Sequence, residues 1–286
     1  MSFTVEVPLR WGDMDAQGHV NNAGFVDYLQ EARVDFLLAS PVPYLLGGGI
    51  IVVSHQVEYC APISYSTAPV VAEVTVSAVK GAILELAYTL SHDGNIAAVA
   101  RTRLCPYDFE QCAVRRLTSE ERDYFTSQLE PAEPLRPSRR MPVDARAMET
   151  SLRVRWSDLD SYGHVNNVKF FDYVQEGRIA FSEAVSAEMA RTRGQGTADY
   201  MWMVVRQDVD YVTQLEFRME PYRVATGVAN IGTTSMSFCS EIRDDAGVVY
   251  AKAATTVVCA DQQGRPAAIP DAWRVVLEPY MLSGPS

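Results

Sequence analysis

The sequence predicts an α+β protein built from two similar domains, each an antiparallel sheet wrapped around one central helix. Two observations lead to this fold class. A 26-residue segment occurs twice in the chain, and after each copy a single helical pattern gives way to several strand-like runs. The length of 286 residues fits this arrangement, because a single domain usually holds about 100–150 residues.

The repeated segment is Trp11 to Phe36, which returns as Trp156 to Phe181. The two copies agree at 15 of 26 positions, at a constant spacing of 145 residues and without a gap. Two copies this far apart indicate a pair of equivalent domains, since a solenoid needs at least three shorter repeats. Fusion of two such domains would let them pair as a pseudo-dimer within one chain. A monomer and a further homo-oligomer both remain compatible with this prediction.

Each half has the same order of expected elements: a short strand, a polar loop, a helix and then strand-like runs. The helix is indicated by Phe25, Leu29, Ala32 and Phe36, whose spacings of three and four place them on one buried stripe. Because the strand-like runs outweigh the helix, the sheet should dominate each domain. The expected strands are residues 4–10, 50–59, 70–79, 83–91 and 96–104 in the first half, and 151–155, 201–211, 223–230, 234–243 and 248–258 in the second.

A proline-rich stretch separates the halves. Residues 131–142 contain four prolines, and proline fixes φ and lacks an N–H, so we expect a semi-extended linker. We therefore place the N-terminal domain at residues 1–130, the linker at 131–147 and the C-terminal domain at 148–286. Just before the linker, Thr118 followed by Glu121 predicts a short helix that starts with a capping box.

Composition excludes several classes of function. The net charge of −11 disfavours nucleic-acid binding, because an acidic surface repels phosphate backbones. No stretch of about 18 apolar residues is present, so no membrane span is expected. Five scattered cysteines without a C-x-x-C pair, and no secretory leader, favour a reducing, cytoplasmic location. The absence of nucleotide-loop and metal-binding motifs predicts that no cofactor or metal is used.

The most specific part of the repeat is D-x-D-x-x-G-H-V-N-N, at residues 13–22 and 158–167. Together with the F-x-D-Y and E-x-R of the following helix, it resembles the hotdog-fold thioesterases of the 4-hydroxybenzoyl-CoA thioesterase type. It is also similar to the related acyl-ACP thioesterases, which are tandem hotdog proteins. The resemblance covers residues 3–108 and 149–260. It implies two hotdog domains and hydrolysis of a thioester.

The resemblance also assigns roles within the loop. A main-chain N–H at the start of the helix would hold the thioester carbonyl, where a helix N-terminus offers unpaired donors. The second aspartate would act as general base toward water or attack directly to give an anhydride, and both routes stay open. The implied catalytic residues are Asp15 and Asp160, supported by Asp13 and Asp158, with the N–H groups at about Asn22 and Asn167.

Other residues near the motif have more than one reading. Gly18 and Gly163 could adopt a backbone conformation closed to other residues, allow close approach of the carbonyl, or simply make a turn. We expect His19 and His164 to orient the loop rather than shuttle protons. We expect Asn21 and Asn166 to cap the helix. Glu31 and Glu176 should be buried or paired structural carboxylates near Arg33 and Arg178 rather than bases. Tyr28 and Tyr173 are expected to bind substrate, and Lys80 and Arg101 to contact CoA.

The preferred function is therefore an acyl-CoA thioesterase, in lipid or aromatic-acid metabolism. An acyl-ACP thioesterase is the first alternative, although the net charge disfavours an acidic carrier protein. A non-catalytic acyl-thioester sensor is the second, and retention of both Asp15 and Asp160 argues against it. A hotdog hydratase would need an Asp-plus-His dyad in a different loop. His55 has no histidine counterpart, since Gln207 takes its place, but we expect both sites to work.

Overall fold

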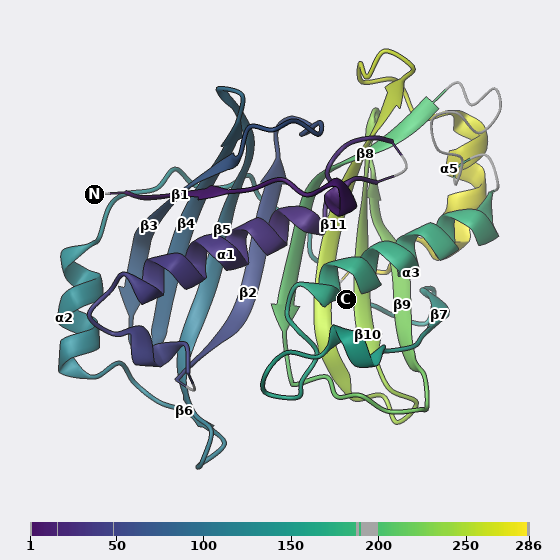
Figure 1. Cartoon of the computed structure of the whole chain (residues 1–286). Coiled ribbons are helices and arrows are strands. Elements are labelled where there is room, and N and C mark those ends of the chain that lie inside the picture. The colour runs from purple at the N-terminus through teal and green to yellow at the C-terminus, as the bar shows by residue number, and fades with distance from the viewer. Residues whose placement is uncertain (1, 16, 48, 187–188, 190–199, 285–286) are drawn as a thin grey trace. The chain divides into compact units, whose positions relative to one another are not determined.

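The computed structural model describes residues 2–15, 17–47, 49–186, 189 and 200–284. The chain divides into two compact units, Met1–Arg136 and Pro137–Ser286. Each unit contains one long helix lying across an antiparallel sheet, as the sequence predicts (Figure 1). Among the described helices, none is long and apolar enough to cross a membrane.

The first unit has five main strands in the order β1-β3-β4-β5-β2, with all neighbours antiparallel. The helix α1 crosses this sheet and contacts β1 and β3. The short strand β6 pairs with the end of β5. The elements are β1 (Phe3–Val7), η1 (Trp11–Asp13), α1 (Gly24–Leu38), η2 (Pro43–Leu45), β2 (Ile50–Tyr59), β3 (Val70–Lys80), β4 (Ile83–His92), β5 (Asn95–Asp108), β6 (Ala113–Val114) and α2 (Ser119–Ser127).

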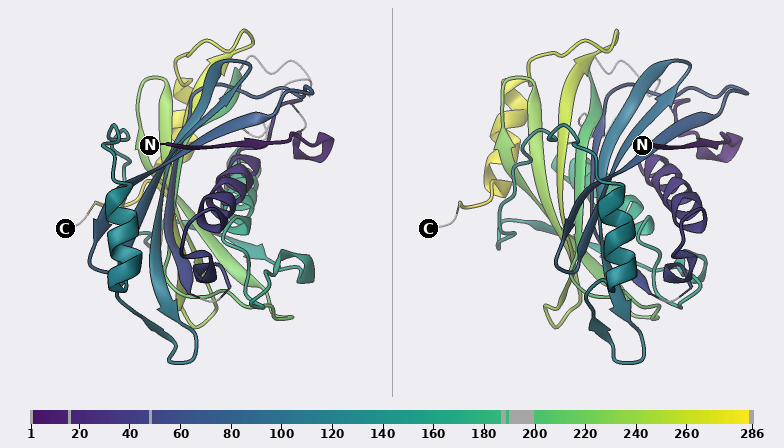
Figure 2. Two further views of the ribbon diagram at one scale, coloured as in Figure 1. Left: turned by 60° about the vertical axis from the view of Figure 1, so that its left-hand side comes forward. Right: turned by 90° about the vertical axis from the view of Figure 1, so that its left-hand side faces the viewer.

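The second unit repeats this topology in the order β7-β9-β10-β11-β8. Its helix α3 contacts β7, β9 and β10, and Figure 2 shows the helix and the sheet from two further sides. The elements are β7 (Met148–Leu152), η3 (Trp156–Asp158), α3 (Lys169–Val185), β8 (Tyr200–Tyr211), β9 (Tyr222–Ile231), β10 (Ser235–Arg243), β11 (Val249–Asp261), α5 (Asp271–Leu277) and η4 (Glu278–Tyr280).

The apolar stripe predicted for the first helix is buried against the sheet. Phe25, Leu29, Ala32 and Phe36 are each no more than 5% exposed. Burial of a large apolar side chain contributes about 1.5–3 kcal/mol relative to an exposed one, so this stripe fixes which face of α1 meets the strands. The polar N-terminus of the helix, where the D-x-D loop enters, is thereby held in a constant position on the sheet.

The first strand of each unit ends earlier than the sequence predicts. β1 stops at Val7 rather than at residue 10, because Pro8 has no N–H to continue the ladder. β7 spans Met148–Leu152 rather than 151–155, and its register pairs it only with residues 222–226 of β9. In both units the residues after the strand form a short 3-10 helix, which leads into the D-x-D loop.

A short C-terminal helix completes the core of each unit. The predicted capping box of α2 is confirmed: Glu121 N donates to Thr118 Oγ1 at 3.2 Å, and Thr118 N donates to Glu121 Oε2 at 2.8 Å. Phe125 of this helix packs near Phe36 of α1. The sequence did not predict α5, whose Trp273 joins a core cluster with Phe181 of α3.

Candidate active site

A tight turn precedes each central helix. Asp15 N donates to His19 O at 2.7 Å, and Gly18 N donates to Asp15 O at 3.0 Å. Gly18 and Gly163 have φ values of +78° and +80°, in the left-handed region that favours glycine. A Cβ at either position would meet nothing within 4 Å. The positive φ therefore accounts for glycine at both positions, and approach of a substrate carbonyl to them stays a prediction.

The first aspartate of the motif ties the loop to the helix. Asp13 Oδ2 accepts from Arg10 N at 2.8 Å and from Tyr28 Oη at 2.9 Å. Burial first, and then the bond to Asp13, raise the pKa of the Tyr28 phenol, so Tyr28 remains an O–H donor. Because the Tyr28 side chain is buried, this contact positions the loop. Its predicted contact with substrate stays a prediction.

The second unit builds the same anchor. Asp158 Oδ2 accepts from Arg155 N at 2.8 Å and from Tyr173 Oη at 2.6 Å. Tyr173 is buried, and its pKa is raised by burial and by the Asp158 bond. Asp158 is itself buried. The supporting aspartates of the two units thus hold their loops through equivalent contacts.

The second aspartate uses only one carboxylate oxygen within the loop. Asp15 Oδ1 accepts from Gln17 N at 2.7 Å and from His19 N at 3.4 Å. Asp160 Oδ1 accepts from Tyr162 N at 2.9 Å and from His164 N at 3.3 Å. Within the described part of the chain, neither Oδ2 atom has a hydrogen-bond donor. One oxygen therefore organises the loop, and the other is available to accept a proton or to attack a carbonyl carbon.

The loop then enters the helix through an asparagine pair. Asn21 Oδ1 accepts from Ala23 N at 3.1 Å, and Asn166 Oδ1 accepts from Val168 N at 3.1 Å, so each asparagine closes the turn that leads into its helix. The N-cap residues themselves are Ala23 and Val168, and neither has a side-chain cap. Among the described residues, the Asn22 N–H has no acceptor. A donor left unpaired at a helix N-terminus can stabilise a developing oxyanion.

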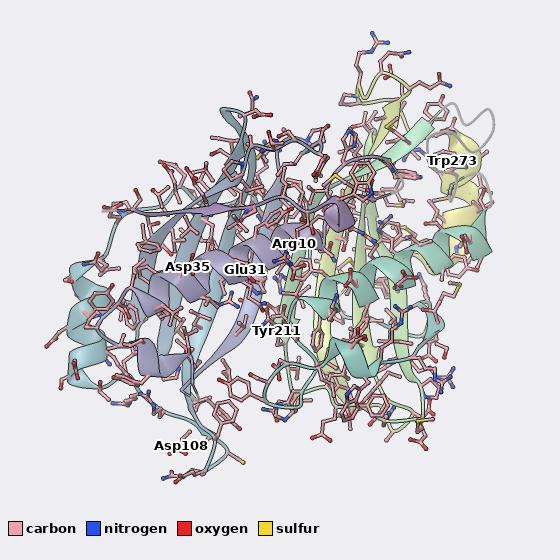
Figure 3. The ribbon with its side chains drawn as sticks, viewed as in Figure 1. Arg10, Glu31, Asp35, Asp108, Tyr211 and Trp273 are labelled. Carbon is pink, nitrogen blue, oxygen red and sulfur yellow. The ribbon has the colours of Figure 1, made fainter. Side chains whose placement is uncertain are left out.

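Two strand tyrosines also hold the entry to the helix, and the sequence analysis did not identify their role. Tyr59 Oη donates to Asn22 O at 3.0 Å, and Tyr211 Oη donates to Asn167 O at 2.8 Å (Tyr211 is labelled in Figure 3). Both residues close equivalent strands, β2 and β8. Their equivalent positions at the ends of the two strands could have drawn attention to them. Their partner oxygens could not be predicted, because these lie tens of residues away in the sequence.

The expectation for the helix glutamates is wrong. Glu31 and Glu176 are exposed, and among the described side chains neither forms an ion pair with Arg33 or Arg178. Residues two apart on a helix do not face each other. The arginine of each E-x-R pattern therefore turns toward the sheet while the glutamate turns toward solvent. Burial lowers the pKa of Arg178 to about 10.

The two cations predicted to contact CoA differ in exposure. Lys80 is exposed at the end of β3. Arg101 is buried on β5, where Nη1 donates to Ala100 O at 2.8 Å and Nη2 donates to Glu133 O. The Arg101 guanidinium is thus engaged by main-chain carbonyls of its own unit. The CoA contacts of both residues stay predictions. Among the described residues, no three His, Cys, Asp or Glu side chains gather as metal ligands would.

A family model described as the thioesterase-like superfamily matches residues 9–145 and 154–277. The chain belongs to this superfamily. Each matched segment covers most of one unit, so each unit is a hotdog domain and the repeat predicted from the sequence is confirmed. A comparison with curated proteins finds no match.

Solved structures support the tandem arrangement of the fold. An oleoyl thioesterase from Lactobacillus plantarum aligns with a TM-score of 0.70 at 13% identity, over 90% of this chain and 96% of that one. A 12:0-ACP thioesterase from Umbellularia californica aligns with a TM-score of 0.69 at 14% identity, over 90% of this chain and 94% of that one. At these identities the likeness establishes the fold alone.

Proposed function

We propose that this protein hydrolyses acyl-CoA thioesters to a free acid and CoA, with one site in each unit. The observation that carries the proposal is the duplicated loop, in which Asp15 and Asp160 each keep one oxygen without a donor among the described residues. In the first unit this loop leads to the unpaired N–H of Asn22. A base and an oxyanion donor are the two groups that thioester hydrolysis requires.

The chemistry follows from these groups. The thioester carbonyl oxygen accepts from the N–H at the helix start, and Asp15 Oδ2 takes a proton from water as the water oxygen bonds to the carbonyl carbon. The tetrahedral intermediate then breaks its carbon–sulfur bond and releases CoA thiolate, which takes up a proton. Direct attack by the same oxygen, giving a mixed anhydride that water opens, uses the same groups. A thiolate leaves readily, so no strong general acid is needed.

Acyl-ACP hydrolysis is the second candidate. It is supported by the fold likeness to the 12:0-ACP thioesterase from Umbellularia californica. The net charge of −11 favours CoA, because an acidic surface repels an acidic carrier protein at long range. A sensor that only binds thioesters would have no use for a carboxylate at both loops.

Thiol release from short-, medium- and long-chain and aromatic acyl-CoAs, and from matching acyl-ACPs, tests the proposal. The wild type should hydrolyse acyl-CoA, and the Asp15→Asn/Asp160→Asn double variant should lose about a hundredfold or more of kcat. The matched control is Glu31→Gln/Glu176→Gln, which removes two exposed carboxylates from the helices that follow the two loops. Retained activity in the aspartate variant with loss in the glutamate variant would overturn the assignment of the base. Binding of acyl-CoA by a wild type that hydrolyses none of the panel would establish a sensor.

A further inference from the structure

Each D-x-D loop begins with an exposed tryptophan. Trp11 is 75% exposed and Trp156 is 74% exposed, and they are equivalent residues of the two units. A single exposed aromatic side chain on a protein surface needs no explanation. Here the same large side chain is exposed at the same place in both units, two residues before the anchoring aspartate. This repetition points to a binding role for the exposed indole ring.

A second aromatic side chain supports each tryptophan. Trp11 meets Tyr65 at 5.2 Å between ring centroids and an angle of 83°, and Trp156 meets Phe217 at 5.3 Å and 84°. Tyr65 and Phe217 follow β2 and β8 and are themselves partly exposed. An edge-to-face contact of this kind fixes a ring while leaving one of its faces open to a further planar group. The chain thus presents the same small aromatic platform twice.

An arginine precedes each aromatic platform in the sequence. Arg10 and Arg155 directly precede the two tryptophans, and both are exposed. Burial and the Asp13 bond raise the pKa of Tyr28, whereas the positive charge of Arg10 lowers it. The Arg10 charge therefore acts on the Tyr28–Asp13 contact that holds the loop. Arg155 acts in the same way on Tyr173. Arg10 is the only lysine or arginine in residues 1–32.

We propose that Trp11–Tyr65 with Arg10, and Trp156–Phe217 with Arg155, form two subsites for the nucleotide part of CoA. The adenine base stacks on the open indole face, and the guanidinium pairs with a phosphate. The pantetheine arm is flexible, so the nucleotide can fold back beside the loop that receives the thioester. This inference rests on the proposed function and names its substrate class, because an acyl group on a carrier protein brings no adenine.

Direct binding of the nucleotide part tests the subsites without any reaction. Titration calorimetry with adenosine 3′,5′-bisphosphate should show binding to the full-length wild type. The Trp11→Ala/Trp156→Ala variant should bind about tenfold or more weakly, because loss of one stacked base contact is worth that much. Trp11→Phe/Trp156→Phe restores a stacking ring and should regain most of the affinity. Val275→Ala changes a residue of α5 that is 68% exposed and serves as a control outside the loop.

Kinetics with two substrates that differ only in the nucleotide completes the test. The wild type should prefer acyl-CoA over the same acyl group on pantetheine, and the preference should fall by about tenfold in the alanine variant. No binding of the bisphosphate, or equal loss for both substrates in the alanine variant, would overturn the subsites. Hydrolysis of both substrates without a preference would also remove the subsites and leave the proposed function standing. Binding of the bisphosphate by a protein that hydrolyses no thioester would support the subsites and remove the proposed function.

Discussion

The two units agree in the loop before the helix and differ in the layer below the helix. The tyrosine-to-aspartate bond is 2.9 Å in the first unit and 2.6 Å in the second, and the strand tyrosine meets the helix entry at 3.0 Å and 2.8 Å. The loops therefore share these contacts as well as the D-x-D-x-x-G-H-V-N-N pattern. This agreement supports the proposal that the shared chemistry lies in the loop rather than in the sheet.

Beneath the helix, equivalent positions carry different side chains. His55, whose Nδ1 lies 2.8 Å from Thr102 Oγ1, is replaced by Gln207, and the buried Tyr88 is replaced by the buried Ser240. Registers of β4 and β10 make the second pair equivalent, since Tyr88 faces Ala100 and Ser240 faces Ala253. These exchanges leave polar atoms unpaired, since among the described residues Tyr88 Oη and Gln207 Nε2 are buried without a hydrogen-bond partner. The two units thus differ in packing and agree in the groups that would perform the reaction.

The largest predicted difference between the units concerns their C-terminal helices. Glu121 at the start of α2 is fully buried and accepts from Arg115 Nη1 and Nη2, both at 2.8 Å. Burial alone would raise the pKa of Glu121, but the bonds from Arg115 and Thr118 hold it below its usual value. α5 begins at Asp271, and its N-cap residue Pro270 provides no side-chain cap. Ionised Glu121 thus stabilises only the first unit, and this contribution is lost as the pH falls through the lowered pKa.

Glu121→Gln should reduce the free energy of unfolding at neutral pH by about 2–3 kcal/mol, since hydrogen bonds to a charged group are lost. The difference between variant and wild type should shrink as acid protonates Glu121 in the wild type. Hydrogen exchange at neutral pH and at about pH 3.5 is the measurement, and it should show α2 opening in acid before α5. Equal acid sensitivity of the two helices would contradict the assigned role of Glu121.

The anchoring tyrosines should affect turnover equally in the two units. Tyr28→Phe and Tyr173→Phe each remove one hydroxyl from a buried contact with an aspartate. With both changes, kcat should fall about tenfold because the loop loses a bond worth about 1–1.5 kcal/mol, while KM should stay nearly constant. Steady-state kinetics of both single variants and the double variant checks this. A rise in KM with unchanged kcat would instead indicate that the tyrosines bind substrate.

The smallest predicted effect concerns the size of two facing residues, one on the central helix and one on the strand below it. In the first unit Ala32 of α1 and Ala72 of β3 are both buried, and the equivalent residues of the second unit are Gly177 and Val224. A Cβ on Gly177 would lie 2.5 Å from Val224 Cγ1. Gly177→Ala should therefore destabilise the protein by about 1–2 kcal/mol despite its better helix propensity.

Adding Val224→Ala to Gly177→Ala rebuilds the alanine pair of the first unit and should recover most of that loss. Urea unfolding followed by circular dichroism measures both variants. A single Gly177→Ala variant as stable as the wild type would show that the space under α3 is wider than the structure gives.

Local patterns in the sequence predicted most of the fold. The stripe of α1, the capping box of α2 and the strand Ile50–Tyr59 all depend on residues close together in the chain. The sequence did not predict α5, because seven residues without a clear period become a helix only through packing with Phe181, about ninety residues away. The contacts of Tyr59 and Tyr211 were missed for the same reason.

The candidate site was predicted less completely than the fold. The repeated motif singled out Asp15 and Asp160, and resemblance to a family supplied their role. Two shortcomings of the sequence prediction have physical causes, one at the helix glutamates and one at Arg101. The E-x-R pattern suggested nearness of glutamate and arginine, but helix geometry separates them. Arg101 was predicted to contact CoA, yet its guanidinium donates to the carbonyl of Glu133 in the linker, and no local pattern reveals a contact across 32 residues.

The central claim is that the two units carry equivalent sites, each dependent on its own aspartate. The most direct measurement is kcat and KM for acyl-CoA in Asp15→Asn, Asp160→Asn and the double variant, with folding checked by circular dichroism. Equivalent and independent sites predict that each single variant keeps about half of the wild-type kcat at an unchanged KM, and that the double variant keeps less than about one hundredth. One single variant as active as the wild type, with the other as inactive as the double variant, would contradict the claim and leave a single working site.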